Sequence, residues 1–168
     1  ILQVDYPQSR YEIIVVDNCS SDHSSEKITA CFPDVRLIKN EKNAGFPAAN
    51  NQAFRIGRGQ HFLALNPDTL IKKNTLQQSL RVLKNDRSIG CVGVKTLKGN
   101  GEILFSCART CPSMWSTFWH IFYFDTIFGK WKFFGSSDMT YWDHNDSRDV
   151  DLLHGGYMMF HGQLAAFD

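Results

Sequence analysis

Two short apolar runs, each followed at once by polar residues that include an aspartate, constrain the fold of this chain most. Residues 13–16 read IIVV and run into Asp17 and Asn18, and residues 61–65 read HFLAL and run into an Asn-Pro-Asp turn. Continuous apolar runs of this length are typical of parallel strands that are covered on both faces. Ordinary turn chemistry explains either polar loop when it is taken alone.

Segments with helical spacing alternate with the apolar runs. We expect helices from the polar loop at residues 18–25 to about residue 31, from Pro47 to Gly57 or Gly59, and over residues 74–83 with Asn74 as cap. The expected strands cover residues 13–16, 35–38, 61–65 and 89–94, and residues 103–105 return as a hairpin partner across an Asn-Gly turn. This alternation predicts an α/β sheet.

Length and composition predict one soluble globular domain, because the chain has 168 residues, 43% of them hydrophobic and 21% charged. The formal net charge of +1 offers no field that would favour nucleic acid. Five irregularly spaced cysteines argue against a disulfide framework and favour a reducing compartment. The absence of a G-x-G-x-x-G or Walker sequence disfavours dinucleotide oxidoreductases and P-loop enzymes. The first twelve residues do not have the pattern of a signal peptide.

The segment of residues 114–134 differs in composition, because it carries ten aromatic side chains. Trp115, Phe118, Trp119 and Phe122 recur at helical spacing, so the first half is expected to form an amphipathic helix. Polar residues interrupt the segment too often for a membrane span. Two interpretations stay open: an aromatic face packed on the sheet, and a face that meets a membrane surface or a lipid acceptor.

The two aspartate loops predict a ligand site. In an open α/β sheet, ligands bind beyond the carboxyl ends of the strands, so Asp17 and Asp68 would share one edge if their strands are parallel. One carboxylate there could accept from hydroxyl or base N–H groups, and the other could hold a divalent cation beside phosphate oxygens. The small residues of NAGFPAANN, between the two loops, would let a bulky ligand approach the backbone.

Three motifs in this order, EIIVVDNCSSD, VRLIKNEKNAGFPAANNQAF and FLALNPDTL, resemble the inverting nucleotide-sugar glycosyltransferases of family two. The rhamnosyltransferase-like enzymes are the subgroup that the chain resembles most. The stretches IGCVGVKTLKGNGEI and WDHNDSRDVDLLHGGYMM continue the resemblance, which covers nearly the whole chain.

The resemblance implies a GT-A fold, with a mostly parallel central sheet flanked by helices. It implies one domain over residues 1–168, with a nucleotide-binding half at 1–95 and an acceptor-side half at 96–168. The implied reaction moves a sugar, rhamnose in the subgroup, from a dTDP- or UDP-sugar to a glycan or lipid-linked acceptor with inversion. It implies Mg²⁺ or Mn²⁺ as cofactor and a place in cell-envelope polysaccharide synthesis. The implied location is the cytoplasm, at the inner face of the membrane, with peripheral membrane association.

The resemblance also implies roles for individual residues. Asp17 would contact the nucleotide base or ribose, and Asp68 would hold the metal as the last acid of its motif, which begins here with Asn66. The other residues that it places around the substrate are Asn18 and Asp22 in the loop of Asp17, Asn43, Gly45, Phe46 and Asn50 along the nucleotide pocket, and Gly155 and Gly156 near the sugar.

The resemblance places two parts of the family outside residues 1–168: a first strand beside residues 13–16, and a Glu-Asp motif with the general base. We therefore expect no activity from this chain alone. The alternative to an enzyme is a catalytically inactive remnant that at most binds nucleotide or a protein partner.

Two further sets of residues are weak candidates. Arg109 and Arg148 could reach a diphosphate, although surface arginines are common. A metal cluster could be formed by acids and histidines whose spacing fits no defined site: Asp143, His144, Asp146, His154 and His161.

Overall fold

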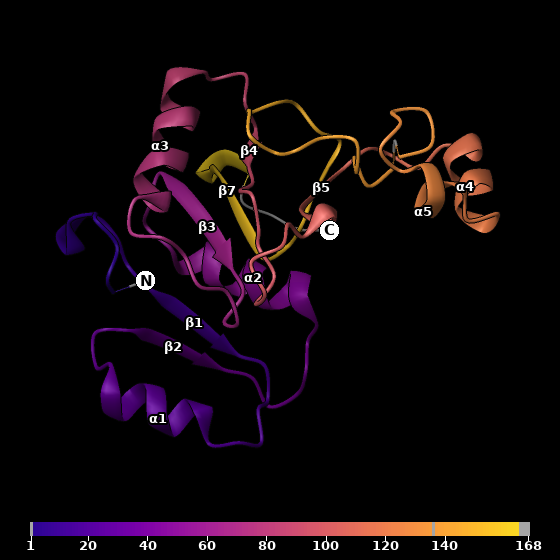
Figure 1. The fold of residues 1–168 in the computed structure, drawn as a ribbon. Helices are drawn as coiled ribbons and strands as arrows, with labels where there is room; N and C mark the ends of the chain where they lie inside the picture. Colours follow the sequence, from indigo (N-terminus) through magenta and orange to yellow (C-terminus); the bar gives the residue numbers. More distant parts are fainter. Residues whose placement is uncertain (1, 136, 165–168) are drawn as a thin grey trace. The chain divides into compact units, whose positions relative to one another are not determined.

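The computed structural model describes residues 2–135 and 137–164 (Figure 1). Contacts divide the chain into two compact units. Unit 1 comprises Ile1–Ala64, Asp68–Val92 and Met159–Asp168, and unit 2 comprises Leu65–Pro67 and Gly93–Met158. The organisation as one domain with halves at 1–95 and 96–168 stays a prediction.

The first two strands of unit 1 form a parallel pair. β1 (Ile14–Asp17) pairs with β2 (Arg36–Lys39), with Asp17 opposite Lys39, and α1 (Ser24–Cys31) connects them. Both predicted strands are confirmed, with a shift of one residue. The shift arises because the Asn40 N–H donates to the Asp17 carbonyl at 2.9 Å, which carries the ladder one residue into the polar loop.

Two longer helices belong to unit 1, α2 (Phe46–Ile56) and α3 (Thr75–Asn85), and both were predicted. Pro47 lies in the first turn of α2, where its missing N–H costs nothing. Asn74 is the N-cap residue of α3, as predicted, although its side chain makes no capping hydrogen bond. Leu83 of α3 is fully buried, and α3 packs against β4.

A second sheet has the strand order β3 (His61–Leu65), β7 (Tyr157–His161) and β4 (Cys91–Val92). The strand at 61–65 is confirmed. The strand predicted at 89–94 is reduced to two residues antiparallel to β7, because Gly90 and Gly93 flank it and contribute no side chain to a strand. Phe54 of α2 packs edge-to-face on Phe62 and Phe160, with ring centroids 5.3 Å apart in each pair.

Unit 2 has a small core of its own, in which Cys107, Ala108, Met139 and Trp142 are buried together. β5 (Ala108–Arg109) pairs antiparallel with β6 (Leu152–Leu153). The predicted hairpin across the Asn-Gly turn is confirmed as a short one, with an antiparallel bridge between Leu97 and Ile103 and a hydrogen bond from the Lys98 N–H to the Glu102 carbonyl at 2.8 Å. All four tryptophans of the chain lie in this unit. The 3-10 helices of the two units are η1 (Gln8–Arg10), η2 (Phe105–Cys107) and η3 (Gly162–Leu164).

The aromatic segment forms two short helices, α4 (Met114–Ile121) and α5 (Phe124–Phe128), which contact each other. The predicted helix over its first half is therefore confirmed. Of the two open interpretations, the exposed fractions of 68% for Trp115 and 56% for Phe122 argue against a face that is packed on a sheet. Among the described residues, no helix has both the length and the apolar character needed to cross a bilayer.

Candidate functional site

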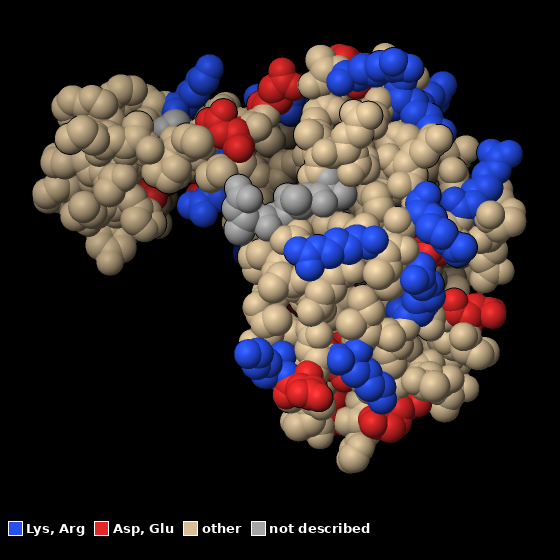
Figure 2. Space-filling model, turned by 180° about the vertical axis from the view of Figure 1, so that it is seen from behind, with Lys and Arg blue, Asp and Glu red and all other residues tan. Residues whose placement is uncertain are grey.

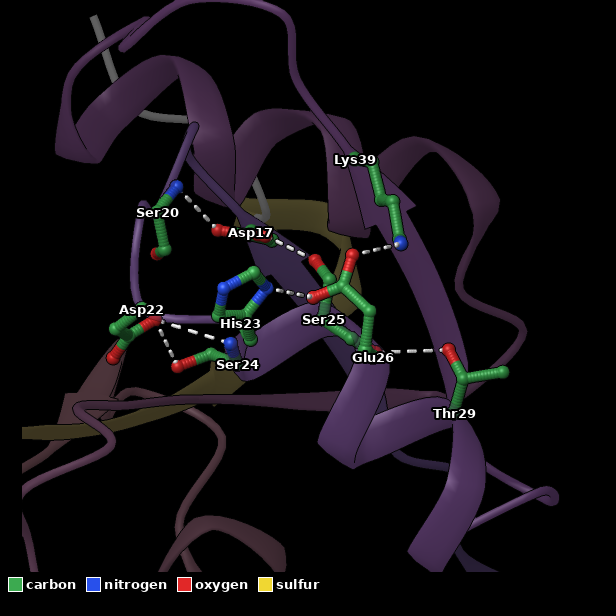
Figure 3. A network of polar contacts seen from close by, with 9 residues as sticks. All are labelled: Asp17, Ser20, Asp22, His23, Ser24, Ser25, Glu26, Thr29 and Lys39. Carbon is green, nitrogen blue, oxygen red and sulfur yellow. Dashed lines mark hydrogen bonds and ion pairs between the residues drawn. The ribbon is translucent and has the colours of Figure 1, made fainter.

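Asp17 ends β1, and its carboxylate is held by the serine-rich loop that follows (Figure 3). One oxygen accepts from the Ser20 N–H at 2.9 Å, and the other accepts from the hydroxyl of Ser25, a buried residue of α1. The hydrogen bonds from Ser20, and then from Ser25, lower the pKa of Asp17 below its ordinary value of 3.8. The carboxylate is therefore charged at neutral pH, and each oxygen keeps a lone pair for a further donor.

The Asn18 side chain ties this loop to the segment that precedes α2. Its Oδ1 accepts from Asn40 Nδ2 at 3.1 Å and from the Ala44 N–H at 2.9 Å, and its Nδ2 donates to Asn43 Oδ1 at 2.8 Å. The Asn18 side chain thus joins two predicted site segments that lie about 25 residues apart in sequence. These hydrogen bonds occupy the Asn18 amide, so a ligand would bind to the neighbouring residues and not to Asn18.

The start of α2 brings three further predicted residues together. Gly45 has φ +83°, a conformation that strains any residue with a Cβ, and its N–H donates to Asn43 Oδ1 at 2.9 Å. Asn50 Nδ2 donates to the Phe46 carbonyl at 2.9 Å, one turn back along the helix. The Phe46 side chain is 43% exposed, so its ring is accessible beside this turn.

Asp22 lies two residues before α1, and its side chain points to the first residue of that helix. Its Oδ1 accepts from the Ser24 N–H at 3.1 Å and from the Ser24 hydroxyl at 2.5 Å, and these bonds lower its pKa from 3.8. His23, between them, has φ +59°. Asp22 therefore shapes the turn into α1 (Figure 3), and its part in substrate binding stays a prediction.

Asp68 lies in the turn after β3, exposed, and no described residue makes a hydrogen bond or an ion pair with its carboxylate. Asp17 ends β1 and Asp68 follows the end of β3, and the arrows of these strands run in the same general direction in Figure 1, but the two strands belong to different sheets. In unit 2, the Asn66 N–H donates to the Gly156 carbonyl at 3.1 Å, which joins two predicted residues through the backbone. Gly155 adjoins this contact and is half-buried.

The weaker candidates are engaged within unit 2. Arg109 forms an ion pair with Asp138 at 2.6 Å, and Arg148 pairs with Asp146 at 2.8 Å and lies over the ring of Trp142. Both guanidinium groups are therefore paired with carboxylates of the chain itself. The weak candidate for a metal cluster among the acids and histidines of 143–161 is not found, since the described residues contain no group of three His, Cys, Asp or Glu side chains that could hold a metal ion.

Sequence reasoning missed three polar groups that shape this region. Ser25 and Asn40 hold Asp17 and Asn18, and Glu12 accepts from the Arg58 N–H at 2.6 Å and pairs with Arg36 at 3.3 Å. The bond from the Arg58 backbone lowers the pKa of Glu12 most. The SSDHSS run gave a signal for the serines, but nothing local marks Glu12 as a contact of residues 24 and 46 positions away.

A comparison with protein families gives a match between residues 1–142 and the model of glycosyl transferase family 2. The chain belongs to glycosyl transferase family 2. The family predicted from the motifs of Asp17, Asn43 and Asp68 is therefore confirmed.

Relatives of this family 2 chain include an uncharacterised glycosyltransferase of Methanocaldococcus jannaschii, 33% identical over 97 residues, which are 55% of this chain and 33% of the relative. The poly(ribitol-phosphate) beta-N-acetylglucosaminyltransferase TarS of Staphylococcus aureus is 26% identical over 114 residues, 66% of this chain and 20% of TarS. The chain therefore spans a third or less of the length of these relatives.

Solved structures give the same fold. The mannosyltransferase PcManGT of Pyrobaculum calidifontis, in complex with GDP-Man and Mn²⁺, matches with a TM-score of 0.51 and 25% identity over 58% of this chain and 29% of its own. TarS residues 1–349 in complex with UDP match with a TM-score of 0.51 and 23% identity over 68% of this chain and 32% of their own. The predicted α/β fold of the GT-A type is confirmed for this family 2 chain.

Proposed function

We propose that this chain is the nucleotide-sugar-binding part of an inverting glycosyltransferase. The enzyme would move a sugar from a nucleoside diphosphate to a hydroxyl group of a glycan or lipid-linked acceptor. Rhamnose is the sugar proposed, from the resemblance to the rhamnosyltransferase-like subgroup, and dTDP- or UDP-sugars are the proposed donors. The complexes of PcManGT with GDP-Man and of TarS with UDP support a nucleotide donor.

This proposal rests mainly on the hydrogen bonds by which Asn18 joins the Asp17 loop to residues 40–45. Asn18 follows the charged Asp17 directly, and it joins the Asp17 loop to the segment that leads into Gly45 and the exposed Phe46. A carboxylate accepts from base N–H or ribose hydroxyl groups, and an aromatic ring offers an apolar face to a base. The preformed loop would lower the entropy lost when a nucleotide binds.

Asp68 is the proposed protein ligand of a divalent cation. Its carboxylate is exposed and makes no hydrogen bond or ion pair with another described residue, so it is free for a cation of the Mg²⁺ or Mn²⁺ kind, which prefers oxygen ligands. Asn66 replaces a second carboxylate with a neutral amide, so phosphate oxygens must supply most of the remaining negative charge. A bound cation would supply positive charge next to the diphosphate leaving group.

The proposed transfer also needs a general base that takes the proton from the acceptor hydroxyl. The family resemblance assigns this base to a Glu-Asp motif outside residues 1–168. Within this chain, the proposed work of Asp17 is to hold the nucleotide, and that of Gly155 and Gly156 is to let the sugar approach the backbone. The proposed location is the cytoplasm at the inner face of the membrane, in the synthesis of cell-envelope polysaccharide.

Calorimetric titration with dTDP and UDP, with and without Mn²⁺, tests the proposal. We expect Asp17→Ala to weaken nucleotide binding under both conditions by about tenfold, the loss of one charged hydrogen bond. We expect Asp68→Ala to abolish only the gain due to Mn²⁺. Asp34→Ala, an exposed aspartate in the turn after α1, is the matched control.

A nucleotide affinity that changed neither on addition of Mn²⁺ nor in Asp68→Ala would rule out the proposed metal ligand. Binding by the full-length protein without any transfer of a labelled sugar would instead favour a remnant that only binds nucleotide.

A further inference from the structure

The aromatic surface, defined here as residues 113–134, is a group of exposed apolar side chains on α4, α5 and the turns that follow. Tyr123 is 71% exposed, Ile127 69% and Trp131 65%. In Figure 2 the atoms of α4 and α5, at the left of the view, are almost entirely tan. Exposed apolar patches of this kind mark sites of interaction with proteins, ligands or membranes.

The aromatic surface is fixed by its own packing. The ring of Trp119 contacts those of Phe124 and Phe134 at centroid distances of 5.6 and 5.1 Å. Ser113 and Ser116 form a capping box that begins α4. Trp115 and Trp131 thus belong to a packed aromatic cluster, and both side chains remain mostly exposed.

The exposed charged side chains of the aromatic surface are positive. Asp125 is the only acidic residue between residues 103 and 134, and its carboxylate contacts His120 Nδ1 at 2.7 Å with 22% of the side chain exposed. Lys130 and Lys132 are exposed on either side of Trp131. The surface therefore presents two cations beside aromatic rings, and its single acid is turned toward a histidine.

A hollow of about 590 Å³ lies in the same surface. Its walls are mostly apolar and Lys132 lines it together with Ser113, Trp115, Ser116, Trp119 and Phe133. An apolar recess next to an amine matches an amphiphile that has a hydrocarbon part and a phosphate.

We propose that the aromatic surface docks this protein on a bilayer that contains anionic phospholipid. Tryptophan and tyrosine favour the interface between hydrocarbon and water, and lysines there are attracted by the negative surface potential. Helices of eight and five residues lie on a bilayer and do not cross it. A second copy fits less well, because a twofold interface would set the same two lysines against each other with one shielded acid to offset them.

This docking would hold the glycosyltransferase near a lipid-linked acceptor, a role that rests on the proposed function. The docking itself depends on residues 113–134, and nucleotide binding depends on Asp17 and Asp68. The two proposals can therefore fail separately.

Vesicle flotation with the full-length protein tests the docking, using phosphatidylcholine vesicles with and without phosphatidylglycerol. We expect binding to the anionic vesicles, weakened at least about tenfold by Lys130→Glu with Lys132→Glu, and weakened by added salt. We expect Trp115→Ser with Trp131→Ser to weaken it as well. Lys72→Glu with Lys73→Glu, exposed residues before α3, is the control of equal charge and should bind much more tightly than the Lys130/Lys132 pair.

Circular dichroism and dTDP or UDP titration of every variant establish that folding and nucleotide binding are kept. Absence of vesicle binding in a protein that still binds nucleotide would overturn the docking alone. Equal losses in the two lysine pairs would overturn it too, since net charge and not this surface would then govern binding. Self-association that the tryptophan changes abolish, without vesicle binding, would assign the surface to a second copy.

Discussion

At the carboxyl end of β1, two neighbouring residues of similar size have different tasks. Asp17 carries a charge that two serines stabilise, and Asn18 carries none and uses its amide to join two loops. An aspartate at position 18 could not donate to Asn43 Oδ1, and an asparagine at 17 would lose the charge that Ser20 and Ser25 stabilise. The order of the two side chains therefore matters more than their polarity.

Asp17→Asn should change how stability depends on pH. Because the pKa of Asp17 is lowered in the folded chain, its contribution to the free energy of unfolding is full above the ordinary value of 3.8. That contribution is lost as the pH falls through the lowered pKa of the folded state. We expect the variant to be less stable than the wild type at neutral pH and to lose less stability on acidification.

Urea unfolding, followed by far-UV circular dichroism from neutral to acid pH, measures this dependence. Asp34→Asn controls for the removal of one surface charge, and it should follow the wild type. Parallel losses of stability in the wild type and Asp17→Asn would contradict the assignment.

Among single residues, the sequence allowed prediction of those with unusual local chemistry. Asp17 stands directly after an apolar run, Asp68 stands in the turn after another, and Gly45 directly precedes a helix with a proline in its first turn. Glu12 and Asn40 could not be predicted in this way, because their partners come close only in the folded chain. Side-chain hydrogen bonds between distant segments leave no periodic signal.

The helix α3 shows how an element is fixed by one face. Leu83 on this face is fully buried in the described structure, and the helix packs on the short strand β4. This packing explains why α3 is stable although Asn74 gives it no side-chain cap.

Leu83→Ala should lower the free energy of unfolding by about 2–5 kcal/mol, because it removes buried methyl groups and leaves a cavity. Leu70→Ala is the matched control, since the Leu70 side chain is completely exposed, and it should change stability by less than about 0.5 kcal/mol. Urea unfolding followed by far-UV circular dichroism measures both. Similar values for the two variants would show that α3 is not anchored through Leu83.

Elements with a continuous local pattern were predicted well, as β3 and α2 show. β7 was not predicted and β4 was predicted too long, because their two-residue ladder is formed by Cys91 and Val92 with residues nearly 70 positions later. For the aromatic face of α4 the sequence left two interpretations open, because helical spacing reports which residues share a face and not what covers it. Burial of that face is a tertiary property.

At the scale of the whole molecule, a formal net charge of +1 at pH 7 gives little electrostatic repulsion between copies. The exposed aromatic surface adds attraction, so solubility near neutral pH should be low. Changing Lys130 and Lys132 to glutamate subtracts four charges and gives a net charge of −3.

We expect this double change to raise the concentration at which turbidity begins at pH 7, because both repulsion and the polarity of the aromatic surface increase. Lys72→Glu with Lys73→Glu reaches the same net charge and should give a smaller rise. Turbidity that is unchanged in both pairs would show that neither net charge nor this surface limits solubility.

The placing of all four tryptophans in unit 2 has a consequence for spectroscopy. Indole emission reports on residues 65–67 and 93–158, whereas Asp17, Asn18 and Asp68 belong to the unit that has none. A fluorescence melt would therefore follow the aromatic unit and miss the loss of the nucleotide loops. A single tryptophan introduced in place of Phe46, beside Gly45, would give the other unit an optical signal of its own.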